Sequence, residues 1–346
     1  MKSWDVIIAG AGIIGVSLAL ELRQRSASVL VLDRADPGSE ASSAAAGMLA
    51  PADPETPEAL RQLAMESARI FAAFVQRVES AAGIQVDFRR VGTLALMSEP
   101  TAPREYRGLS AAELQLLEPS IHRSEHSAYF VREDSVDPNL LTRAALAAAQ
   151  THGVEVRGHT AVTEIRAGGD AVEILTGTET LSAASAVDCR GAWSGAPVRP
   201  RKGQMLYVLP EGKLLQHVLR APEVYVVPRS SGKILIGATV EDVGFDKSVD
   251  SSAIRQLLNA AAKYLPALAS APIIQSWAGL RPGTPDDLPI IGPTDIPRVF
   301  AATGHFRNGI LLAPITAKIM ADLVQGRPSP LDIRAFSPHR FRSTQK

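Results

Sequence analysis

Three glycines near the N-terminus and one acid downstream have the residue types and spacing of a nucleotide-binding site. Gly10, Gly12 and Gly15 form a G-x-G-x-x-G motif directly after the apolar run VIIA, and Asp33 ends the next apolar run. The first glycine allows a tight turn, the second lets a pyrophosphate approach the backbone, and the third lets a helix pack closely on a sheet. A carboxylate about 20 residues further on accepts hydrogen bonds from ribose hydroxyls. The motif therefore predicts a dinucleotide cofactor, and it leaves NAD and FAD as alternatives.

A second chemical signal lies near the C-terminus, in the segment GHFRNGILLAP at 304–314. His305 and Arg307 interrupt a stretch that is otherwise suited to burial. A buried arginine is costly unless an anion meets it. The segment therefore predicts an anionic partner for Arg307, either a bound ligand or an acid such as Asp286 or Asp287.

Hydrophobic patterning indicates the elements that must position these residues. A strand, the glycine turn, a helix and a second strand open the chain over 5–33, and strong helical periodicity follows over 57–82. Residues 203–240 are almost entirely of β type, and a final helix is expected over 311–326. Because α/β patterning also reappears around 139–195, the sequence predicts two interleaved domains rather than two consecutive ones.

Composition excludes several classes of protein. The 346 residues carry 36 Lys and Arg against 36 Asp and Glu, so the basic footprint of a nucleic-acid binder is absent. One cysteine, Cys189, excludes an intrachain disulfide and suits a reducing compartment. The longest apolar run, 6–20, is shorter than the ~20 residues of a membrane helix, and Asp5 beside it argues against an export signal. We therefore expect a cytoplasmic protein without a membrane span, and no metal site is predicted.

The segment ASSAAAGMLAP at 41–51 is rich in small residues. Small side chains permit a flat ligand to approach the backbone, and Ser42 and Ser43 can bond phosphate or ribitol. The thioether of Met48 is polarisable and suited to contact with a ring. Composition alone describes a flexible loop equally well.

Taken together, AAAGML, WAGLRPGTPDDLPIIG at 277–292 and GHFRNGILLAP resemble the D-amino-acid oxidase superfamily of FAD-dependent oxidoreductases. Within it, the sequence is most similar to glycine oxidases of the thiamine-biosynthesis type, over essentially the whole chain. The resemblance implies an α/β fold in which a Rossmann-like FAD-binding domain of the glutathione-reductase type carries an inserted β-rich substrate domain. It also implies non-covalent FAD, because no cysteine follows Arg281 as in sarcosine oxidases.

The inserted arrangement divides the chain into alternating segments. The FAD-binding domain is expected to comprise 1–87, 139–200 and 273–346, and the substrate-binding domain 88–138 and 201–272. The resemblance further implies a homo-oligomer, although no motif identifies its interface.

The resemblance implies oxidative deamination of small amino acids such as glycine, sarcosine and small D-amino acids, with a hydride passing to flavin N5 and oxygen reduced to hydrogen peroxide. Arg281 matches the family's carboxylate-binding arginine, and a planar guanidinium grips a carboxylate through two parallel hydrogen bonds. Tyr225 matches the active-site tyrosine that donates to the same carboxylate, while Arg307 and Met48 would line the substrate cavity. His305 is expected to shape the flavin edge rather than act as a base, because hydride transfer requires an oriented neutral amine more than a proton acceptor.

Most of the expected FAD contacts fall in the motifs already described. They are Gly10, Gly12, Ile13, Ile14, Gly15, Asp33, Arg34, Ser42, Ser43, Ala46, Gly47, Met48, Val162, Gly191, Gly304, His305, Phe306, Arg307, Asn308, Gly309, Ile310 and Leu311. Val162 matches a residue whose backbone holds the adenine, and Gly191 allows a close approach. Arg34 has two interpretations, a reader of a 2′-phosphate or a solvated surface arginine. The final helix would direct its positive N-terminal end at the flavin pyrimidine, where negative charge accumulates on reduction.

The sequence departs from the family at Val240, where the best-known glycine oxidases have a methionine beside the substrate. The size of the preferred substrate is therefore open. Two other functions also remain as alternatives: an FAD-dependent dehydrogenase that passes electrons to a quinone or a partner protein, and a flavin-binding subunit without turnover.

Overall fold

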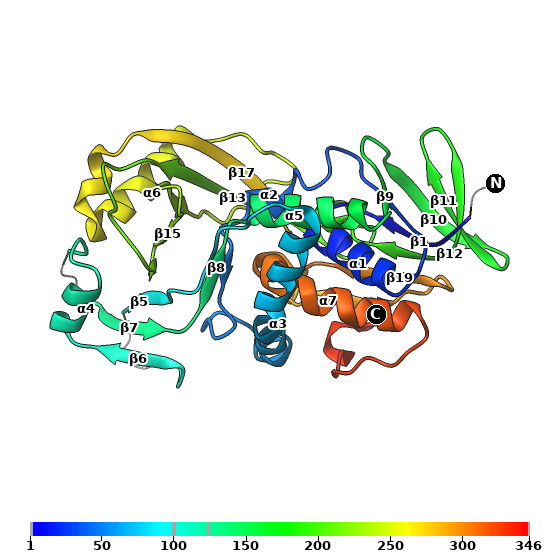
Figure 1. Cartoon of the computed structure of the whole chain (residues 1–346), viewed down its shortest axis with the longest axis horizontal. Coiled ribbons are helices and arrows are strands. Elements are labelled where there is room, and N and C mark those ends of the chain that lie inside the picture. The colour runs from blue at the N-terminus through cyan, green and yellow to red at the C-terminus, as the bar shows by residue number, and fades with distance from the viewer. Residues whose placement is uncertain (1–2, 99–101, 123–124, 345–346) are drawn as a thin grey trace.

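The chain folds into two parts that lie side by side, each built on its own large sheet (Figure 1). A computed structural model describes residues 3–98, 102–122 and 125–344. Residues 99–101 and 123–124 of the predicted substrate-binding segment 88–138 lie outside that description.

The helices are α1 (Ile13–Gln24), α2 (Ala41–Ala44), α3 (Glu58–Ala82), α4 (Ala111–Leu117), α5 (Pro138–Thr151), α6 (Ser251–Tyr264) and α7 (Gly309–Val324), with 3-10 turns η1 (Gly191–Trp193), η2 (Pro266–Ser270), η3 (Phe306–Asn308), η4 (Arg334–Phe336) and η5 (Pro338–Thr344). The first sheet contains β1 (Trp4–Ala9), β2 (Val29–Leu32), β9 (Glu155–Arg157), β10 (Val162–Gly168), β11 (Ala171–Thr176), β12 (Thr180–Asp188), β18 (Ile290–Pro293) and β19 (Val299–Thr303). The second contains β5 (Thr93–Met97), β6 (Tyr106–Leu109), β7 (Ser127–Val131), β13 (Arg199–Val208), β14 (Val218–Ala221), β15 (Val224–Pro228), β16 (Ile234–Gly237) and β17 (Ile273–Gly283). A small third sheet pairs β3 (Met48–Leu49) and β4 (Phe88–Arg89) with β8 (Asp134–Val136).

The first sheet is parallel at its centre, where β12, β1, β2 and β9 run in one direction. Successive side chains of a strand point to opposite faces. Val6 and Ile8 therefore pack into the core beneath the helices, whereas Ile7 packs with residues of β10 to β12 on the other face. Burial on both faces explains why β2 and residues 6–9 of β1 are continuous apolar runs.

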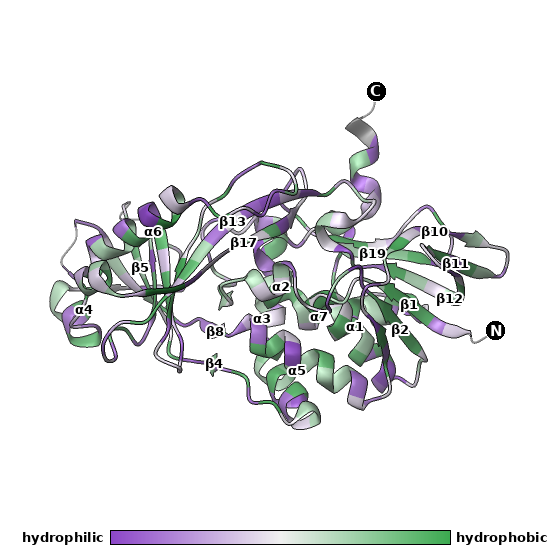
Figure 2. Ribbon diagram, turned by 90° about the horizontal axis from the view of Figure 1, so that it is seen from above, coloured by the Kyte–Doolittle hydropathy of each residue, from purple (hydrophilic) through white to green (hydrophobic). Residues whose placement is uncertain are grey.

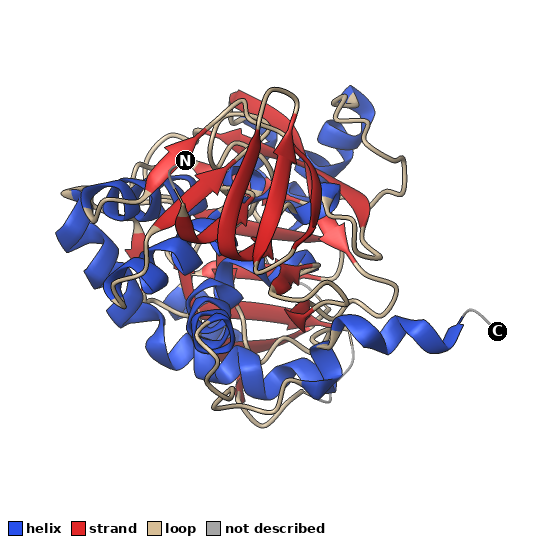
Figure 3. Ribbon diagram, turned by 90° about the vertical axis from the view of Figure 1, so that its right-hand side faces the viewer, coloured by secondary structure: helices blue, strands red, loops and turns tan. Residues whose placement is uncertain are grey.

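Helices α1, α3, α5 and α7 pack against one another beside this sheet. Figure 3 shows helices, in blue, gathered beside the red strands. Their apolar residues form one large core with apolar residues of β1 and β2, which are largely green in Figure 2. Phe71 of α3 is nearly inaccessible in this core. Among the helices of the described ranges, none combines the length and the apolarity needed to cross a membrane.

Helix α6 covers one face of the second sheet. The opposite face is directed toward the part of the molecule that contains the first sheet. Leu206, Val226 and Ile236 pack in a core with residues of α6. Met205 and Tyr225, one position away on the same strands, point to the opposite face. The face of the second sheet that α6 does not cover is therefore available to form one wall of a ligand site.

Several elements differ from the expectations. The loop over 41–51 contains the one-turn helix α2 and the short strand β3. Strand β17 pairs along β13 in the second sheet, although the expected boundary assigned 273–346 to the FAD-binding domain. The pairing joins segments about seventy residues apart, so no local pattern indicates it. The division into domains stays a prediction.

Candidate active site

A cavity of about 900 Å³ is lined by residues from both parts of the molecule. Its walls come from the start of α1, the end of β2, residues 38–56, the open face of the second sheet and the start of α7. The fold therefore brings the dinucleotide motif and Arg281 to one space.

At the glycine turn, the backbone leaves no room for side chains where β1, β12 and α1 meet. A Cβ atom on Gly10, whose φ is +107°, would lie 2.3 Å from the carbonyl oxygen of Cys189, and one on Gly15 would lie 2.0 Å from the carbonyl oxygen of Gly10. Beside the turn, the backbone N–H of Ile13 donates to the Ser42 hydroxyl at 2.9 Å. The start of α1 thus faces the cavity with its N–H groups, as a phosphate-binding turn requires.

Asp33, at the end of β2, is held by two backbone amides. Its Oδ2 accepts from the N–H of Ala11 at 2.7 Å, and its Oδ1 accepts from the N–H of Ala35 at 2.9 Å. Burial raises the pKa of this carboxyl, and the two amide bonds oppose the shift. Each carboxylate oxygen keeps a further lone pair, so Asp33 retains acceptors for ribose hydroxyls on the cavity wall.

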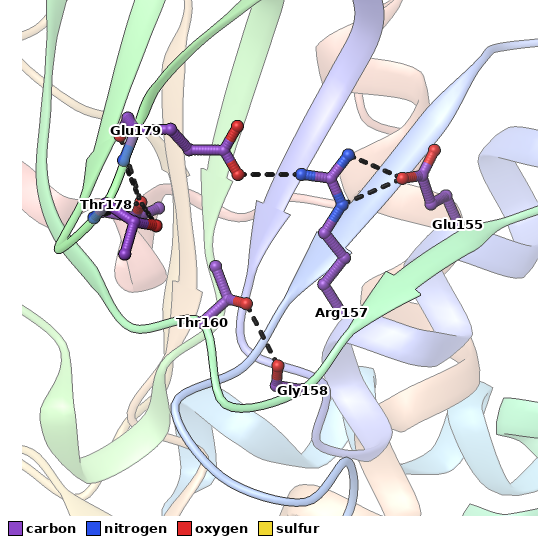
Figure 4. A network of polar contacts seen from close by, with 7 residues as sticks. Glu155, Arg157, Gly158, Thr160, Thr178 and Glu179 are labelled. Carbon is purple, nitrogen blue, oxygen red and sulfur yellow. Dashed lines mark hydrogen bonds and ion pairs between the residues drawn. The ribbon is translucent and has the colours of Figure 1, made fainter.

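The loop after β9 continues the wall beyond Asp33. The N–H of Thr160 donates to the Asp33 carbonyl at 2.7 Å, and the N–H of Asp33 donates to the Arg157 carbonyl at 2.9 Å. Arg157 in turn pairs with Glu155 at 2.7 Å and Glu179 at 3.0 Å (Figure 4). This network fixes the loop whose next residues, 161 and 162, line the cavity.

A buried arginine that no sequence pattern singled out holds the small-residue loop. Arg229, 4% exposed, donates to the carbonyl oxygens of Val136 at 2.9 Å and Ala46 at 2.6 Å, and its Nε donates to the Tyr207 hydroxyl at 3.3 Å. At Gly47, with φ of +78°, a Cβ would lie 1.9 Å from the Val136 carbonyl oxygen. The loop is therefore fixed against the second sheet instead of flexible.

Arg281 on β17 and Tyr225 on β15 line another part of the cavity. The Arg281 guanidinium lies over Gly203, where a Cβ would approach Nη1 to 2.1 Å, and Nη1 donates to the Thr239 carbonyl at 3.2 Å. The Tyr225 hydroxyl contacts the Met205 sulfur at 3.5 Å. Burial raises the pKa of Tyr225, although the Arg281 charge opposes the shift, so a neutral hydroxyl donor lies beside a cation.

Strand register explains this arrangement. Met205, Gly237 and Tyr225 are direct cross-strand neighbours on β13, β16 and β15, and Arg220 on β14 continues the row. A Cβ at Gly237 would lie 2.7 Å from the Tyr225 hydroxyl oxygen. The missing side chain at Gly237 therefore leaves the tyrosine room at the cavity floor.

A polar network behind Arg281 was not anticipated. The Thr239 hydroxyl donates to Glu241 at 2.5 Å, the Gln204 amide donates to the same carboxylate at 2.8 Å, and buried Lys202 lies 3.6 Å from it. These contacts hold the Thr239 carbonyl that orients Arg281. Polar residues at alternate positions of the β-type run RKGQMLYV are the sequence sign of this network.

The prediction that Arg307 is buried is wrong. Its side chain is 45% exposed and pairs with Glu55, which also lines the cavity. The proposed alternative acids are not its partners, because Asp286 pairs with Arg340 at 2.8 Å. Arg307 points outward from the η3 turn, while the apolar residues after it turn inward on α7.

His305, in contrast, is buried and 3% exposed. Its Nε2 lies 3.1 Å from the Thr316 hydroxyl, and burial lowers the pKa of the imidazole to about 3. The ring is therefore uncharged at neutral pH, and its low pKa makes it a weak proton acceptor.

Most residues expected to contact FAD or substrate line the cavity. Those on its wall are Gly10, Gly12, Ile13, Ile14, Asp33, Arg34, Ser42, Ala46, Gly47, Met48, Val162, Gly191, Tyr225, Arg281, His305, Phe306, Arg307, Asn308, Gly309 and Ile310. Gly15, Ser43, Gly304 and Leu311 are not among the lining residues. Gly15 packs against the turn, Ser43 donates to the Glu40 carbonyl, and Leu311 is buried.

The glycine turn, the acid after β2 and a cavity that continues to an arginine fit a flavin dinucleotide and a small anionic substrate. Residues 5–323 match the family described as FAD dependent oxidoreductase (DAO). The chain belongs to this family, and FAD is its cofactor.

Within the family, the chain is similar to glycine oxidases. It is 34% identical to the glycine oxidase of Bacillus licheniformis, over 100% of both chains. It is 37% identical to the bifunctional protein ThiO/ThiG of Trichormus variabilis over 98% of this chain, and spans about half (55%) of that longer protein. The crystal structure of glycine oxidase from Geobacillus kaustophilus superposes with a TM-score of 0.94 at 30% identity, covering 98% of this chain and 99% of the other. The expected family and two-domain FAD-binding fold are thus confirmed.

The buried His305 predicts a pH dependence of stability. An exposed histidine has a pKa of 6.5 and the folded one about 3, so the unfolded chain binds more protons between these values. The free energy of unfolding should fall as the pH is lowered through this window, by up to about 1.4 kcal/mol per pH unit. His305→Gln should remove that contribution. Urea unfolding of both proteins across the window measures it, and equal pH slopes would contradict the assignment.

Proposed function

We propose that this protein oxidises the amino group of a small amino acid, with molecular oxygen as the final electron acceptor and hydrogen peroxide as a product. The observation that carries the proposal is the pair formed by Arg281 and Tyr225 on the wall of the cavity that also holds the glycine turn. A guanidinium and a neutral hydroxyl donor match a carboxylate. The glycine oxidase relatives support the same substrate class, and we assign the reaction to thiamine biosynthesis.

The protein's own residues bind and orient the substrate. Arg281 holds the carboxylate with charge-assisted hydrogen bonds, its direction set by the Thr239 carbonyl, and the Tyr225 hydroxyl donates to the same group. When bound, FAD would supply the two-electron acceptor for the α-carbon hydride and the means of passing the two electrons to oxygen, which would be reduced to hydrogen peroxide. The substrate amine must be neutral to release that hydride, and uncharged His305 adds no positive charge against it. Positioning thus accounts for most of the protein's contribution.

The cavity wall favours small substrates without restricting them to glycine. Gly237 leaves space beside Tyr225, and Val240, 42% exposed, is shorter than a methionine. We therefore infer that glycine, sarcosine and small D-amino acids compete for the same position, with the side chain or the N-methyl group directed toward Val240.

An aerobic substrate panel tests this function. Glycine, sarcosine, D-alanine, D-proline and a bulky D-amino acid are supplied to the purified protein, and hydrogen peroxide is measured. We expect peroxide from the small substrates at rates that saturate with concentration. A bulky D-amino acid that is much faster than all of these would contradict the small-substrate assignment. Substrate oxidation without peroxide would indicate a dehydrogenase.

Arg281→Ala tests the carboxylate site. Loss of the charge-assisted pair should lower kcat/KM for the best substrate about 100-fold or more. The matched control is Arg255→Ala, which removes an exposed arginine from α6 on the opposite face of the same sheet and should change kcat/KM less than about twofold. Near-normal kinetics of Arg281→Ala, with FAD still bound, would exclude Arg281 as the carboxylate anchor.

A further inference from the structure

A loop of the second sheet reaches the cofactor side of the cavity. Residues 238–250 connect β16 to α6, and every side chain from 242 to 250 is exposed. Phe245 lies in this polar segment, EDVGFDKSVD, and is itself 52% exposed. Its aromatic contact is with Trp193, with ring centroids 5.4 Å apart and planes inclined by 32°.

The loop contacts residues that lie close to Asp33 in the sequence or pack on its neighbour Arg34. Trp193 ends η1, directly after β12, and the Arg34 guanidinium lies 4.3 Å from the centre of its ring. Both residues line the cavity, as does Glu40, which pairs with Lys247 of the loop at 3.1 Å. The arrangement also accounts for Arg34, because its exposed side chain packs on Trp193 beside the ribose-binding acid.

The loop is anchored to the second sheet at both ends and at one point between them. Asp246 lies 3.5 Å from Lys202, and the N–H of Asp250 donates to the Gln204 side chain at 2.7 Å. Glu241 pairs with the backbone of Lys202 as an isolated bridge. The loop is thus tied to the second sheet at both ends and at Asp246, while the neighbouring side chains of Phe245 and Lys247 contact residues on the cofactor side of the cavity.

We infer that the 241–250 loop closes the adenosine half of the FAD site, with Phe245 stabilising the Trp193–Arg34 wall. Dinucleotide retention then depends on a contact between the two parts of the molecule. The inference rests on FAD binding and not on the identity of the amino-acid substrate.

Phe245 is expected to contribute most of the binding free energy that this loop adds. Aromatic pairs contribute enough to change a dissociation constant by about 3- to 10-fold, whereas the partly exposed Lys247–Glu40 ion pair contributes little. Because FMN lacks the adenosine half of FAD and ADP lacks the flavin, the two probes separate a local effect from a general loosening.

The test compares Phe245→Ala with Val243→Ala, a truncation on the same loop at a residue that is 45% exposed. Release of FAD from the diluted holoenzyme is followed by flavin fluorescence, and ADP and FMN are titrated into the flavin-free protein. We expect Phe245→Ala to release FAD about 3- to 10-fold faster and to bind ADP correspondingly more weakly, with FMN binding and the melting temperature unchanged.

Three results would overturn the inference: FAD release equal in the two variants, unchanged ADP affinity, or weakening of FMN to the same degree as FAD. The last result would show that Phe245 stabilises the protein as a whole and not the adenosine half of the site in particular. If the wild-type protein binds FAD normally but no amino acid reduces it, the proposed function fails while this test still stands.

Discussion

One buried guanidinium holds the cofactor side and the substrate side of the cavity together. Arg229 follows β15, the strand that carries Tyr225, and the two residues are four positions apart, so their side chains lie on the same face. A buried arginine without acceptors would be strongly destabilising. Here the carbonyl oxygens of Val136 and Ala46 accept its hydrogen bonds, and Ala46 belongs to the small-residue loop that lines the cavity. Fixing Arg229 therefore fixes the distance between the small-residue loop and the tyrosine.

Around this anchor, two kinds of close packing shape the cavity. On the cofactor side, Gly10 and Gly15 let α1 approach the sheet so closely that its N-terminus faces the site. On the substrate side, Gly203 and Gly237 leave room for Arg281 and Tyr225 above the sheet. Missing side chains thus determine where charge and hydrogen-bond donors are available, and the surrounding polar contacts determine their direction.

Local chemistry made part of this site predictable. The glycine turn and Asp33 follow from residue spacing, because turn, helix start and acid lie within one short segment. Arg281 and Tyr225 were assigned only through family resemblance, since their proximity depends on pairing among β13, β15, β16 and β17. Arg229 was missed because its acceptors are distant in the chain. Arg307 lines the cavity as expected, but its burial was predicted wrongly, because apolar neighbours in sequence do not show which way a 3-10 turn directs a side chain. Whether a single polar residue within an apolar segment is buried can be decided only from the tertiary structure.

The proposed function requires that a small amino acid, held by its carboxylate at Arg281, reduces the bound flavin directly. Anaerobic mixing of the holoenzyme with glycine or sarcosine, followed by flavin absorbance, measures this step without any external electron acceptor. The account predicts complete bleaching at a rate that saturates with substrate concentration. A holoenzyme whose flavin stays oxidised with every small amino acid would contradict it.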